Sequence, residues 1–586
     1  MKTDRFLSLN ILLLLSVILL FSCKKEEVSP LQPINNDLDF PVLYIEKGSD
    51  IVIDKDWQVD SVILFIDEGV TFRFKNGAGI IIGENWPSAI LALGTEENPI
   101  NFIPFTNGNQ PDDYWGGITL NGNFNMISTI ENCNFIKGCD DEKYAALNVE
   151  YGYISIKNCL FDYSKKYGVL LQSNTRLIEF ENNIIKHTYD HPLVIPPLNV
   201  HKIGDNNIFI PDLSNKGICL ASYSYKDEDL SIVSADDDTI VWKAQTVPYI
   251  VKNGLLFKGG KVKICEGTII AMDNSNGYGS GKIEIKCSLF EVAGTTEKPV
   301  IFTSNELNKQ PGDWNYIEIE KDAVFKNCIF EYGGHYDSYY NGDCMISLGF
   351  DSFATFDSCV FRHSQSDAIL VHEYNDDYAL FSFSNNIFTD LESYAISLHP
   401  ESISSFGSNN IFNDYFINVL GDNINRNYIY WKNPGGVFYV DHLIGFEKDY
   451  SKIEFEPGVV IKFNGGGFII GTNTVNTFIC KGTEQKPIIF TSAKDNPERG
   501  DWKGISFGQN STSDCILDHC QVLYAGKIGS SNRASVRAGC FVTITNSTIA
   551  HSLHWGLIYK EYYNPVLQNN TYFDNLDGNS IGITGW

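Results

Sequence analysis

The sequence predicts an all-β fold, a right-handed parallel β-helix solenoid, and two nested repeats together with the content of one repeat unit predict it. The longer repeat has a period of about 190 residues. In it, Gly-Thr, Pro and Phe recur in one order, and a Trp follows each time. The three copies begin at Gly94, Gly294 and Gly482, and the three tryptophans are Trp115, Trp314 and Trp502. A triplicated segment of this length indicates a repeat protein with three sequential modules.

A finer repeat of about 24 residues runs inside each long one. Its marker is a small polar residue that stands two positions before an apolar one. In the three copies the marker falls at Cys133, Cys159, Asn183 and Asn207, at Cys328, Cys359, Asn386 and Asn410, and at Cys520, Ser547 and Asn570. The modules are therefore expected to be built from short, similar rungs.

One rung contains three short apolar runs, at residues 168–171, 177–180 and 183–185. Each run has the length of a strand, and none shows helical spacing. A rung of three short strands cannot bury its own apolar face, whereas stacked rungs can pair every strand with a neighbour about 4.8 Å away.

The main alternative fold is a leucine-rich repeat, because residues 154–161 also fit that template. A leucine-rich repeat would place a helix or an open turn where this chain has second β-like runs, at residues 368–371 and 556–559. These runs favour the β-helix.

With these motifs, the chain resembles the pectin-lyase-like superfamily of right-handed parallel β-helices. Its Gly-Thr, Pro-Ile-x-Phe-Thr and Gly-Asp-Trp module is similar to that of bacterial extracellular repeat proteins. The resemblance covers roughly residues 40–586. It implies the fold but no single activity, since the superfamily includes lyases, hydrolases, epimerases, adhesins and stalks.

The N-terminus predicts where the protein is located. Lys2 and Arg5 precede an apolar run from Ile11 to Phe21, and residues 20–23 resemble the lipobox of bacterial lipoproteins. We therefore expect a signal peptide over residues 1–22 and lipid attachment at Cys23. The alternative, a transmembrane helix, needs about 20 apolar residues, and this run is shorter.

The residues after Cys23 bear on localisation. Lys24-Lys25-Glu26-Glu27 resembles an export signal that sends some lipoproteins to the outer face of the outer membrane, and an ordinary solvated tether is the alternative. Residues 23–40 are expected to form the lipidated N-terminus and a flexible tether. The modules are then expected over residues 41–245, 246–427 and 428–586.

Composition restricts the partners. The net charge of −28 argues against nucleic acid, because phosphates would be repelled. Neutral glycans, calcium-bridged ligands or a protein ligand suit an acidic surface better. No cofactor is expected, although calcium is possible. The cysteines are expected to be mostly free thiols buried in the rung ladder, and no Cys or His spacing predicts a metal site.

No catalytic signature is found. Cys139-Asp140-Asp141 lacks the companion motifs of pectin hydrolases. Lys165-Lys166 and Arg362-His363 could supply a proton abstractor and a charge neutraliser, but such residues are usually just exposed side chains. A column four residues beyond the rung marker contains Tyr163, His187, Tyr332, His363, Tyr524 and His551, with Asp390, Asp414 and Asp574. This column is expected either to cap a bend or to face a ligand.

Two loops predict the ligand site. The rung between Cys328 and Cys359 is longer than the others, and its insertion lies at residues 331–343; a second loop covers residues 372–378. Binding groups gather on such loops because a rigid scaffold positions them. The candidate residues are His335, Tyr336, Tyr339, Tyr340, His372, Glu373, Tyr374 and Tyr378.

Tyrosines beside Asp and Asn suggest sugar binding, and the two loops are expected to flank one groove. The function expected from the sequence is therefore that of a surface-anchored lipoprotein that binds glycan or another extracellular ligand. A polysaccharide lyase or glycoside hydrolase that uses the groove, and a passive stalk, are the alternatives.

Overall fold

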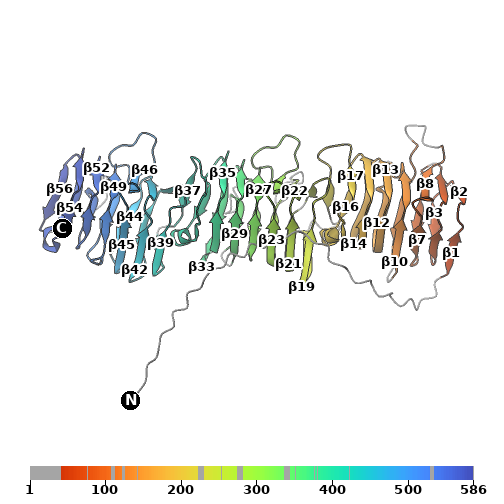
Figure 1. Cartoon of the computed structure of the whole chain (residues 1–586), viewed down its shortest axis with the longest axis horizontal. Helices are drawn as coiled ribbons and strands as arrows, with labels where there is room; N and C mark the ends of the chain where they lie inside the picture. The colour runs from red at the N-terminus through yellow and green to blue at the C-terminus, as the bar shows by residue number, and fades with distance from the viewer. Residues whose placement is uncertain are drawn as a thin grey trace, which may run out of the picture. The chain divides into compact units, whose positions relative to one another are not determined.

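The computed structural model describes residues 41–584, except 76, 107–112, 122–125, 141–142, 222–229, 253, 274–280, 336–343, 350–351, 375–376, 379, 422 and 528–532. For residues 230–238, 373–374, 377–378 and 380 it describes the backbone only. The described chain is a parallel β-solenoid, in which short strands stack coil upon coil (Figure 1). This confirms the predicted parallel, all-β, repeating architecture. No described helix has the length and apolarity to cross a bilayer.

Five stacks of strands form the walls of the solenoid, and we number them sheets I to V in the order in which the chain enters them. Sheet I comprises β1 (Val42–Ile45), β4 (Ile63–Ile66), β7 (Ala89–Leu93), β10 (Ile127–Glu131), the second parts of β12 (Ala145–Lys157), β14 (Tyr167–Glu181), β19 (Leu230–Trp242), β21 (Leu255–Cys265) and β23 (Ile283–Ala293), then β26 (Ala323–Lys326), β29 (Phe353–Asp357), β34 (Leu380–Ser384), β39 (Tyr428–Trp431), β42 (Ser451–Phe455), β45 (Asn476–Lys481), β48 (Ile516–Asp518), β51 (Thr543–Thr545) and β54 (Val566–Gln568). Sheet II comprises β2 (Asp50–Ile53), β5 (Thr71–Phe74), β8 (Ile100–Pro104), β11 (Cys133–Ile136), β13 (Leu160–Ser164), β15 (Ile184–Thr188) and β17 (Ile208–Ile210).

The other three stacks begin later in the coil or later in the chain. Sheet III comprises β3 (Trp57–Val59), β6 (Ile80–Ile82), β9 (Ile118–Asn121), the first parts of β12 and β14, then β16 (Leu193–Ile195), β18 (Ile218–Leu220), β20 (Tyr249–Val251), β22 (Ile269–Met272), β24 (Val300–Ser304), β27 (Cys328–Glu331), β30 (Val360–Arg362) and β35 (Ile387–Thr389). Sheet IV comprises the first parts of β19, β21 and β23, then β25 (Ile317–Ile319), β28 (Cys344–Leu348), β31 (Asp367–Val371), β36 (Ile396–Leu398), β37 (Phe416–Val419), β40 (Val437–Val440), β43 (Val460–Phe463), β46 (Ile488–Ser492), β49 (Cys520–Leu523), β52 (Thr548–Ala550) and β55 (Thr571–Phe573). Sheet V comprises β38 (Asn423–Ile424), β41 (Leu443–Phe446), β44 (Gly467–Ile470), β47 (Gly504–Phe507), β50 (Ala534–Ala538), β53 (Trp555–Lys560) and β56 (Gly578–Ile583).

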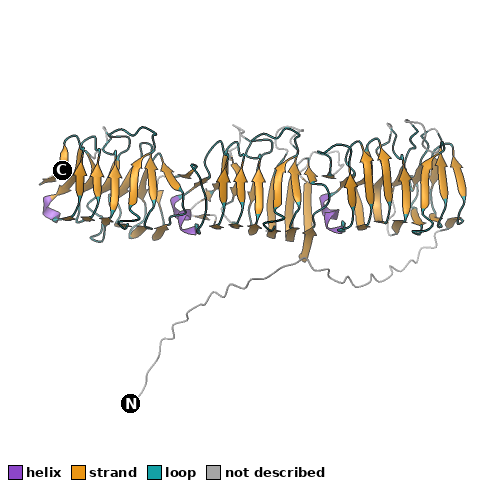
Figure 2. Ribbon diagram, turned by 45° about the horizontal axis from the view of Figure 1, so that its top comes forward, coloured by secondary structure: helices purple, strands orange, loops and turns teal. Residues whose placement is uncertain are grey.

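Two sheets change their place in the coil along the solenoid. Up to β18 each turn of the chain passes sheets I, II and III; from β19 it passes I, III and IV, and from β38 it passes I, IV and V. Near the two changes, short 3-10 turns stand in the place of sheet I, η1 (Pro197–Lys202) and η2 (Pro400–Ser405) (Figure 2). Each turn begins with proline, whose fixed φ suits a helix start but not a strand ladder. A third turn, η3 (Glu561–Tyr563), lies before β54.

The runs that separated a β-helix from a leucine-rich repeat are strands. Residues 368–371 lie in β31, and residues 556–559 lie in β53. In the described residues the strands pair in parallel, apart from the antiparallel hairpin of β32 (Glu373–Tyr374) and β33 (Asp377–Tyr378).

The repeated phenylalanine stacks inside the solenoid. On sheet II, ring centroids are 5.4 Å apart from Phe72 to Phe102 and 4.8 Å apart from Phe102 to Phe135. On sheet III, Phe302 lies 5.0 Å from Phe330. These spacings are close to the distance between paired strands, so each coil adds one ring to the ladder.

The repeated Gly is required by a close approach of the backbone. A Cβ on Gly94, Gly294 or Gly482 would lie 2.4, 2.3 or 2.5 Å from the carbonyl oxygen of Asn132, Asn327 or His519. A side chain at any of these positions would force the next coil away. The glycine motif therefore marks contact between coils.

The repeated Trp ties its loop to the next coil. Trp115, Trp314 and Trp502 are fully buried, and each donates its indole N–H to a backbone carbonyl. The acceptors are Ile136, Glu331 and Leu523, at 2.9, 2.9 and 2.7 Å. A buried indole N–H needs such a partner.

The predicted rung ladder is buried. The Asn183 side-chain oxygen accepts the Cys159 N–H at 3.0 Å, and the Asn207 oxygen accepts the Asn183 N–H at 3.0 Å. The thirteen cysteines of the described residues are buried free thiols. In the ladder, burial raises the pKa of Cys133 and Cys328 well above the usual value, so these thiols are unreactive.

Candidate functional site

Two of the sequence-predicted site residues, His335 and His372, lie at the two ends of sheet IV strands. His335 follows β27 at the bend from sheet III to sheet IV and is exposed; its Nδ1 lies 3.0 Å from the Gly312 carbonyl oxygen. His372 follows β31 at the bend from sheet IV to sheet I and is half-buried, with Nε2 3.1 Å from the Ser347 hydroxyl.

Several predicted residues are described incompletely or not at all. Tyr336, Tyr339 and Tyr340, like Cys23, lie outside the described residues. Glu373, Tyr374 and Tyr378 lie in the hairpin of β32 and β33, of which only the backbone is described.

Between these bends lies the outer surface of sheet IV. Strand β28 begins just after residues 336–343, its neighbour β31 ends just before His372, and the two strands pair in register. Five residues of strand span about 17 Å. His335 and His372 therefore lie at opposite ends of these strands.

A polar network lies on this surface. Asp367, at the start of β31, accepts hydrogen bonds from the hydroxyl of Ser393 at 2.6 Å, from the backbone N–H of Tyr394 at 3.3 Å and from the hydroxyl of Ser397. The Asn418 amide donates to the Ser397 hydroxyl at 3.0 Å. Carboxylate, hydroxyl and amide groups from three neighbouring coils thus meet at one place.

Aromatic rings lie beside the network. The rings of Tyr394 and Tyr439 are 5.5 Å apart, Phe416 and Tyr439 are 5.7 Å apart, and the Lys462 ammonium lies 5.5 Å from the Phe416 ring. Burial, and then the neighbouring Tyr439, raises the pKa of Tyr394 to about 12. The Tyr394 phenol is therefore neutral at physiological pH and can donate a hydrogen bond.

The histidines near the bend from sheet IV to sheet I carry no charge at neutral pH. Burial lowers the pKa of His372. Burial, and then His442 and His372, lowers the pKa of His399 to about 4. Neutral imidazoles can accept a hydrogen bond or a proton.

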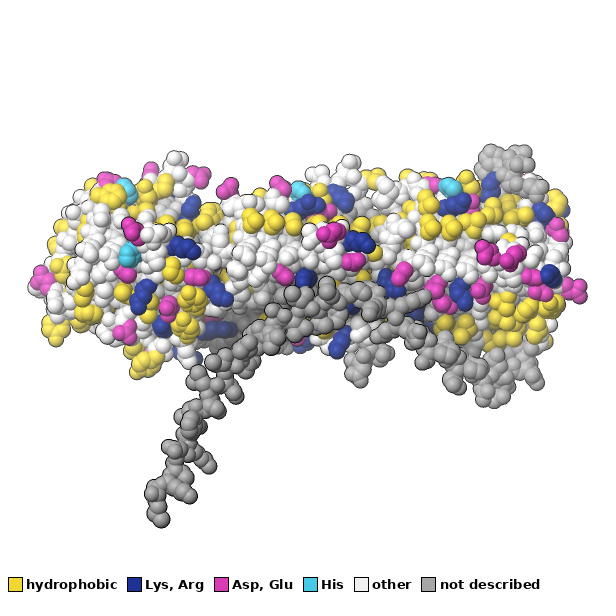
Figure 3. Space-filling model, viewed as in Figure 1, with side chains coloured by type: hydrophobic (Ala, Val, Ile, Leu, Met, Phe, Trp, Pro, Cys, Tyr) yellow, Lys and Arg dark blue, Asp and Glu magenta, His cyan; other side chains and the backbone are white. Residues whose placement is uncertain are grey.

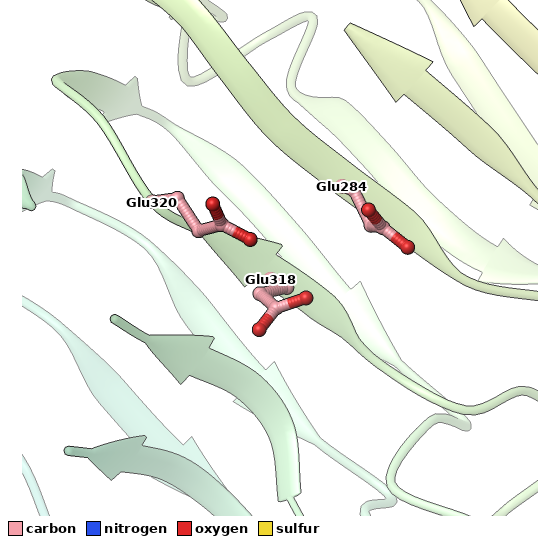
Figure 4. A group of neighbouring side chains, drawn as sticks. All are labelled: Glu284, Glu318 and Glu320. Atoms are coloured by element: carbon pink, nitrogen blue, oxygen red, sulfur yellow. The ribbon is translucent and has the colours of Figure 1, made fainter. Parts of the chain in front are cut away.

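Three carboxyl groups lie further along the same sheet. Glu284, Glu318 and Glu320 have carboxyl oxygens within 4.8 Å of one another (Figure 4). Lys282 and Lys286 contact the Glu284 carboxylate at 2.7 and 3.0 Å, and Lys286 also contacts Glu320 at 2.8 Å. The group has oxygen ligands of the kind calcium takes, but two lysines already offset its charge.

The pKa values of two of these carboxyl groups shift in opposite directions. Burial, then the charges of Glu320 and Glu284, raises the pKa of Glu318. Burial also acts to raise the pKa of Glu284, but hydrogen bonds from Lys282 and Lys286 outweigh it and lower the value.

The Tyr and His column forms stacked pairs at left-handed bends. Ring centroids are 4.4 Å apart for Tyr163 and His187, 4.7 Å for Tyr332 and His363, and 4.6 Å for Tyr524 and His551. The six residues have φ between 52° and 65°. Asp390 and Asp574 continue the column with φ of 51° and 55°, whereas in the coil of Asp414 the left-handed residue is Asn413, because the bend comes one residue earlier.

The other basic candidates have structural partners. Arg362 donates to the buried Glu331 carboxylate at 2.7 Å, and that carboxylate also accepts the Thr303 hydroxyl at 2.7 Å. The Lys166 ammonium lies 5.1 Å from the Tyr144 ring, and Lys165 lies 4.9 Å from the Tyr114 ring. Nearby carboxylates and rings therefore hold these cations.

Sequence reasoning missed the network of Asp367, Ser397 and Asn418 and the rings of Tyr394 and Tyr439. These residues come from separate rungs, so no local motif contains them. The signal available in the sequence was that residues 367, 394, 418 and 439 are separated by about one rung each, which predicts that they lie on neighbouring coils. In comparisons with known proteins, neither a protein-family model, nor a curated protein, nor a solved structure matches this chain.

Proposed function

We propose that the protein is a surface lipoprotein whose solenoid binds a neutral glycan on the outer surface of sheet IV. The observation that carries the proposal is the cluster of tyrosine rings beside the Asp367, Ser397 and Asn418 network on sheet IV. Rings pack on the apolar faces of sugars, and carboxylate and amide groups bond their hydroxyls. The net charge of −28 favours an uncharged ligand.

The proposal includes the anchor and the finer architecture. A signal peptide over residues 1–22, lipid on Cys23 and a tether to residue 40 would hold the protein on the outer membrane, facing the exterior. We propose a right-handed solenoid resembling the pectin-lyase-like superfamily, with modules over residues 41–245, 246–427 and 428–586. The changes of sheet order near η1 and η2 support such boundaries.

Glycan-array screening of the full chain, followed by calorimetry with the best neutral ligand, tests the binding function. Tyr439→Ala is expected to weaken binding by about 1–3 kcal/mol, by analogy with stacking on a base. Tyr450→Ala is the matched control, because Tyr450 is 77% exposed and lies away from sheet IV. Equal binding by wild type and Tyr439→Ala would reject this site. Absence of binding to any glycan would reject the binding function and favour the alternative of a passive stalk.

Glycoside hydrolysis is the second candidate, and the carboxyl pair of Glu318 and Glu284 favours it. Retaining glycosidases use one protonated and one ionised carboxyl group at short separation. Product analysis after incubation with the bound glycan tests this candidate. Wild-type cleavage that Glu318→Gln abolishes, with binding retained, would establish the enzyme; an unsaturated product would indicate a lyase instead.

A further inference from the structure

An apolar patch lies on the outside of the first three coils. The outward positions of sheet I are Val42 and Tyr44 in β1, Ile63 and Phe65 in β4, and Leu91 in β7. Tyr44, Phe65 and Leu91 are paired in register, and the Tyr44 and Phe65 rings stack at 5.2 Å. The intervening residues Leu64 and Ile66 are fully buried, so the alternation of the strand separates core from patch.

At the level of Tyr44, Phe65 and Leu91, the outward positions are polar in the coils that follow. Leu91 pairs with Thr129, and the next partners are Ser155 and Glu179. One position further along, Leu93 is followed by Glu131, Lys157 and Glu181. At these two levels the apolar outer surface therefore ends after β7, whereas Ile127 and Tyr153, which pair in register, are apolar outward positions of the later coils.

Solvent reaches this patch. Val42 is 57% exposed and Tyr44 51%, and Trp86, just before β7, is 63% exposed. The Trp86 backbone N–H donates to the Asp60 carboxylate at 3.4 Å. Figure 3 shows hydrophobic side chains gathered at the lower right, where Figure 1 places β1 and β7.

We propose that this patch docks on the zwitterionic lipid surface to which Cys23 is anchored. The inference rests on the proposed lipid anchor. Residues 24–41 separate Cys23 from β1 and reach at most about 60 Å, so the first coils stay near the bilayer. Tyr and Trp favour the membrane interface, where an apolar ring and a polar group are both solvated.

Charge selects the kind of lipid. Glu46, Asp67 and Glu68 follow the strand ends beside the patch, and Tyr44 donates its hydroxyl to Asp67 at 2.5 Å. With a net charge of −28, anionic headgroups would repel these coils. Docking on phosphatidylcholine is therefore expected to exceed docking on phosphatidylglycerol.

Fluorescence quenching of the full-length lipidated protein in phosphatidylcholine vesicles tests the proposal. Nitroxide-labelled phosphatidylcholine is expected to quench a fraction of the tryptophan emission that is absent in Trp86→Phe. Tyr44→Ser with Phe65→Thr is expected to reduce that fraction roughly two-fold or more, because apolar area drives interfacial binding. Tyr153→Ser, outward on sheet I two coils later, is the matched control and should leave it unchanged.

Three outcomes would overturn the inference. If the protein floats with the vesicles but Trp86 is not quenched, the lipid anchor is supported and docking of the patch is rejected. Protection of Trp86 from acrylamide in the absence of vesicles would show that residues 24–40 or a second copy covers the patch, and sedimentation would tell these apart. Failure to float would reject the lipid anchor itself, on which both proposals depend.

Discussion

The bends before and after the strand that carries the rung marker use the same left-handed backbone with different residues. At the bend that enters the rung ladder, the left-handed residue is usually asparagine: Asn132, Asn158, Asn182, Asn327, Asn385, Asn409, Asn546 and Asn569. At the next bend it is Lys137, Tyr163, His187, Tyr332, His363, Asp390, Asn413, Tyr524, His551 or Asp574. Asparagine tolerates this conformation well, whereas it is uncommon for a bulky residue.

The difference shows that backbone geometry alone does not choose the residue. At the first bend the asparagines bond one another, as Asn182 does to Asn158 at 3.1 Å. At the second bend the rings of consecutive coils stack, which offsets the unfavourable backbone. Polar capping and ring stacking are thus two solutions to one bend, and the following predictions test how much each contributes.

The ladder residue behind the first bend should have the largest effect. Asn183→Leu removes the amide that accepts the Cys159 N–H and donates to the Ile156 carbonyl at 3.0 Å. Leaving these buried groups unpaired should destabilise the surrounding coils by about 3 kcal/mol. Hydrogen exchange of the Cys159 amide measures this. Protection equal to that of wild type would show that the ladder is not a main support.

A change at the first bend itself should cost less. Asn158→Ala keeps the left-handed turn but loses the residue that tolerates it and the bond from Asn182, at a cost of about 1–2 kcal/mol. Asn158→Gly is the control and should recover part of the loss, because glycine adopts this conformation freely. Thermal unfolding of both variants checks the prediction, and equal destabilisation of the two would show that side-chain bonding alone matters at this bend.

Replacing a ring at the second bend should change stability least. Tyr163→Asn loses the stacking on His187 but gains a residue suited to φ of 63°, so the two effects should cancel to within about 1 kcal/mol. Tyr163→Ala loses both and should be the less stable variant. If Tyr163→Asn were as damaging as Asn183→Leu, stacking would be the main support of this bend.

Acid should loosen the second bend at Asp574. The hydrogen bond from His551, followed by that from Arg499, lowers the pKa of Asp574. A lowered carboxyl pKa stabilises the fold above the usual Asp value near 4, and this contribution is lost as pH falls through the folded value. Exchange at His551 should therefore rise in acid, whereas the hydrogen bond from Asn182 to Asn158 joins two amides and should not respond.

Sequence reasoning reached the parts of the fold that repeat. Gly94, Trp314 and Phe102 each make a contact between neighbouring coils, so the same contact recurs in each copy and leaves a visible motif. The change of sheet order is marked in the sequence only by the prolines that begin η1 and η2. These prolines do not show which strands stack on either side of the change.

The candidate site was harder to predict. Asp367 and Asn418 meet only because β31, β36 and β37 stack, and stacking over several coils cannot be read from either segment alone. The extra length of one rung drew attention to residues 331–343, and the strand that ends before His372 drew attention to residues 372–378. The contacts between Asp367, Ser397 and Asn418 could be found only from the register.

The change of sheet order near η1 and η2 has a mechanical consequence. Sheet III passes without interruption from β18 to β20, where sheet II has ended, and sheet IV passes from β37 to β40, where sheet III has ended. The sheets therefore end at different coils along the solenoid. A tensile load along the axis therefore meets an intact sheet at every boundary, and rupture should start elsewhere than between the repeats.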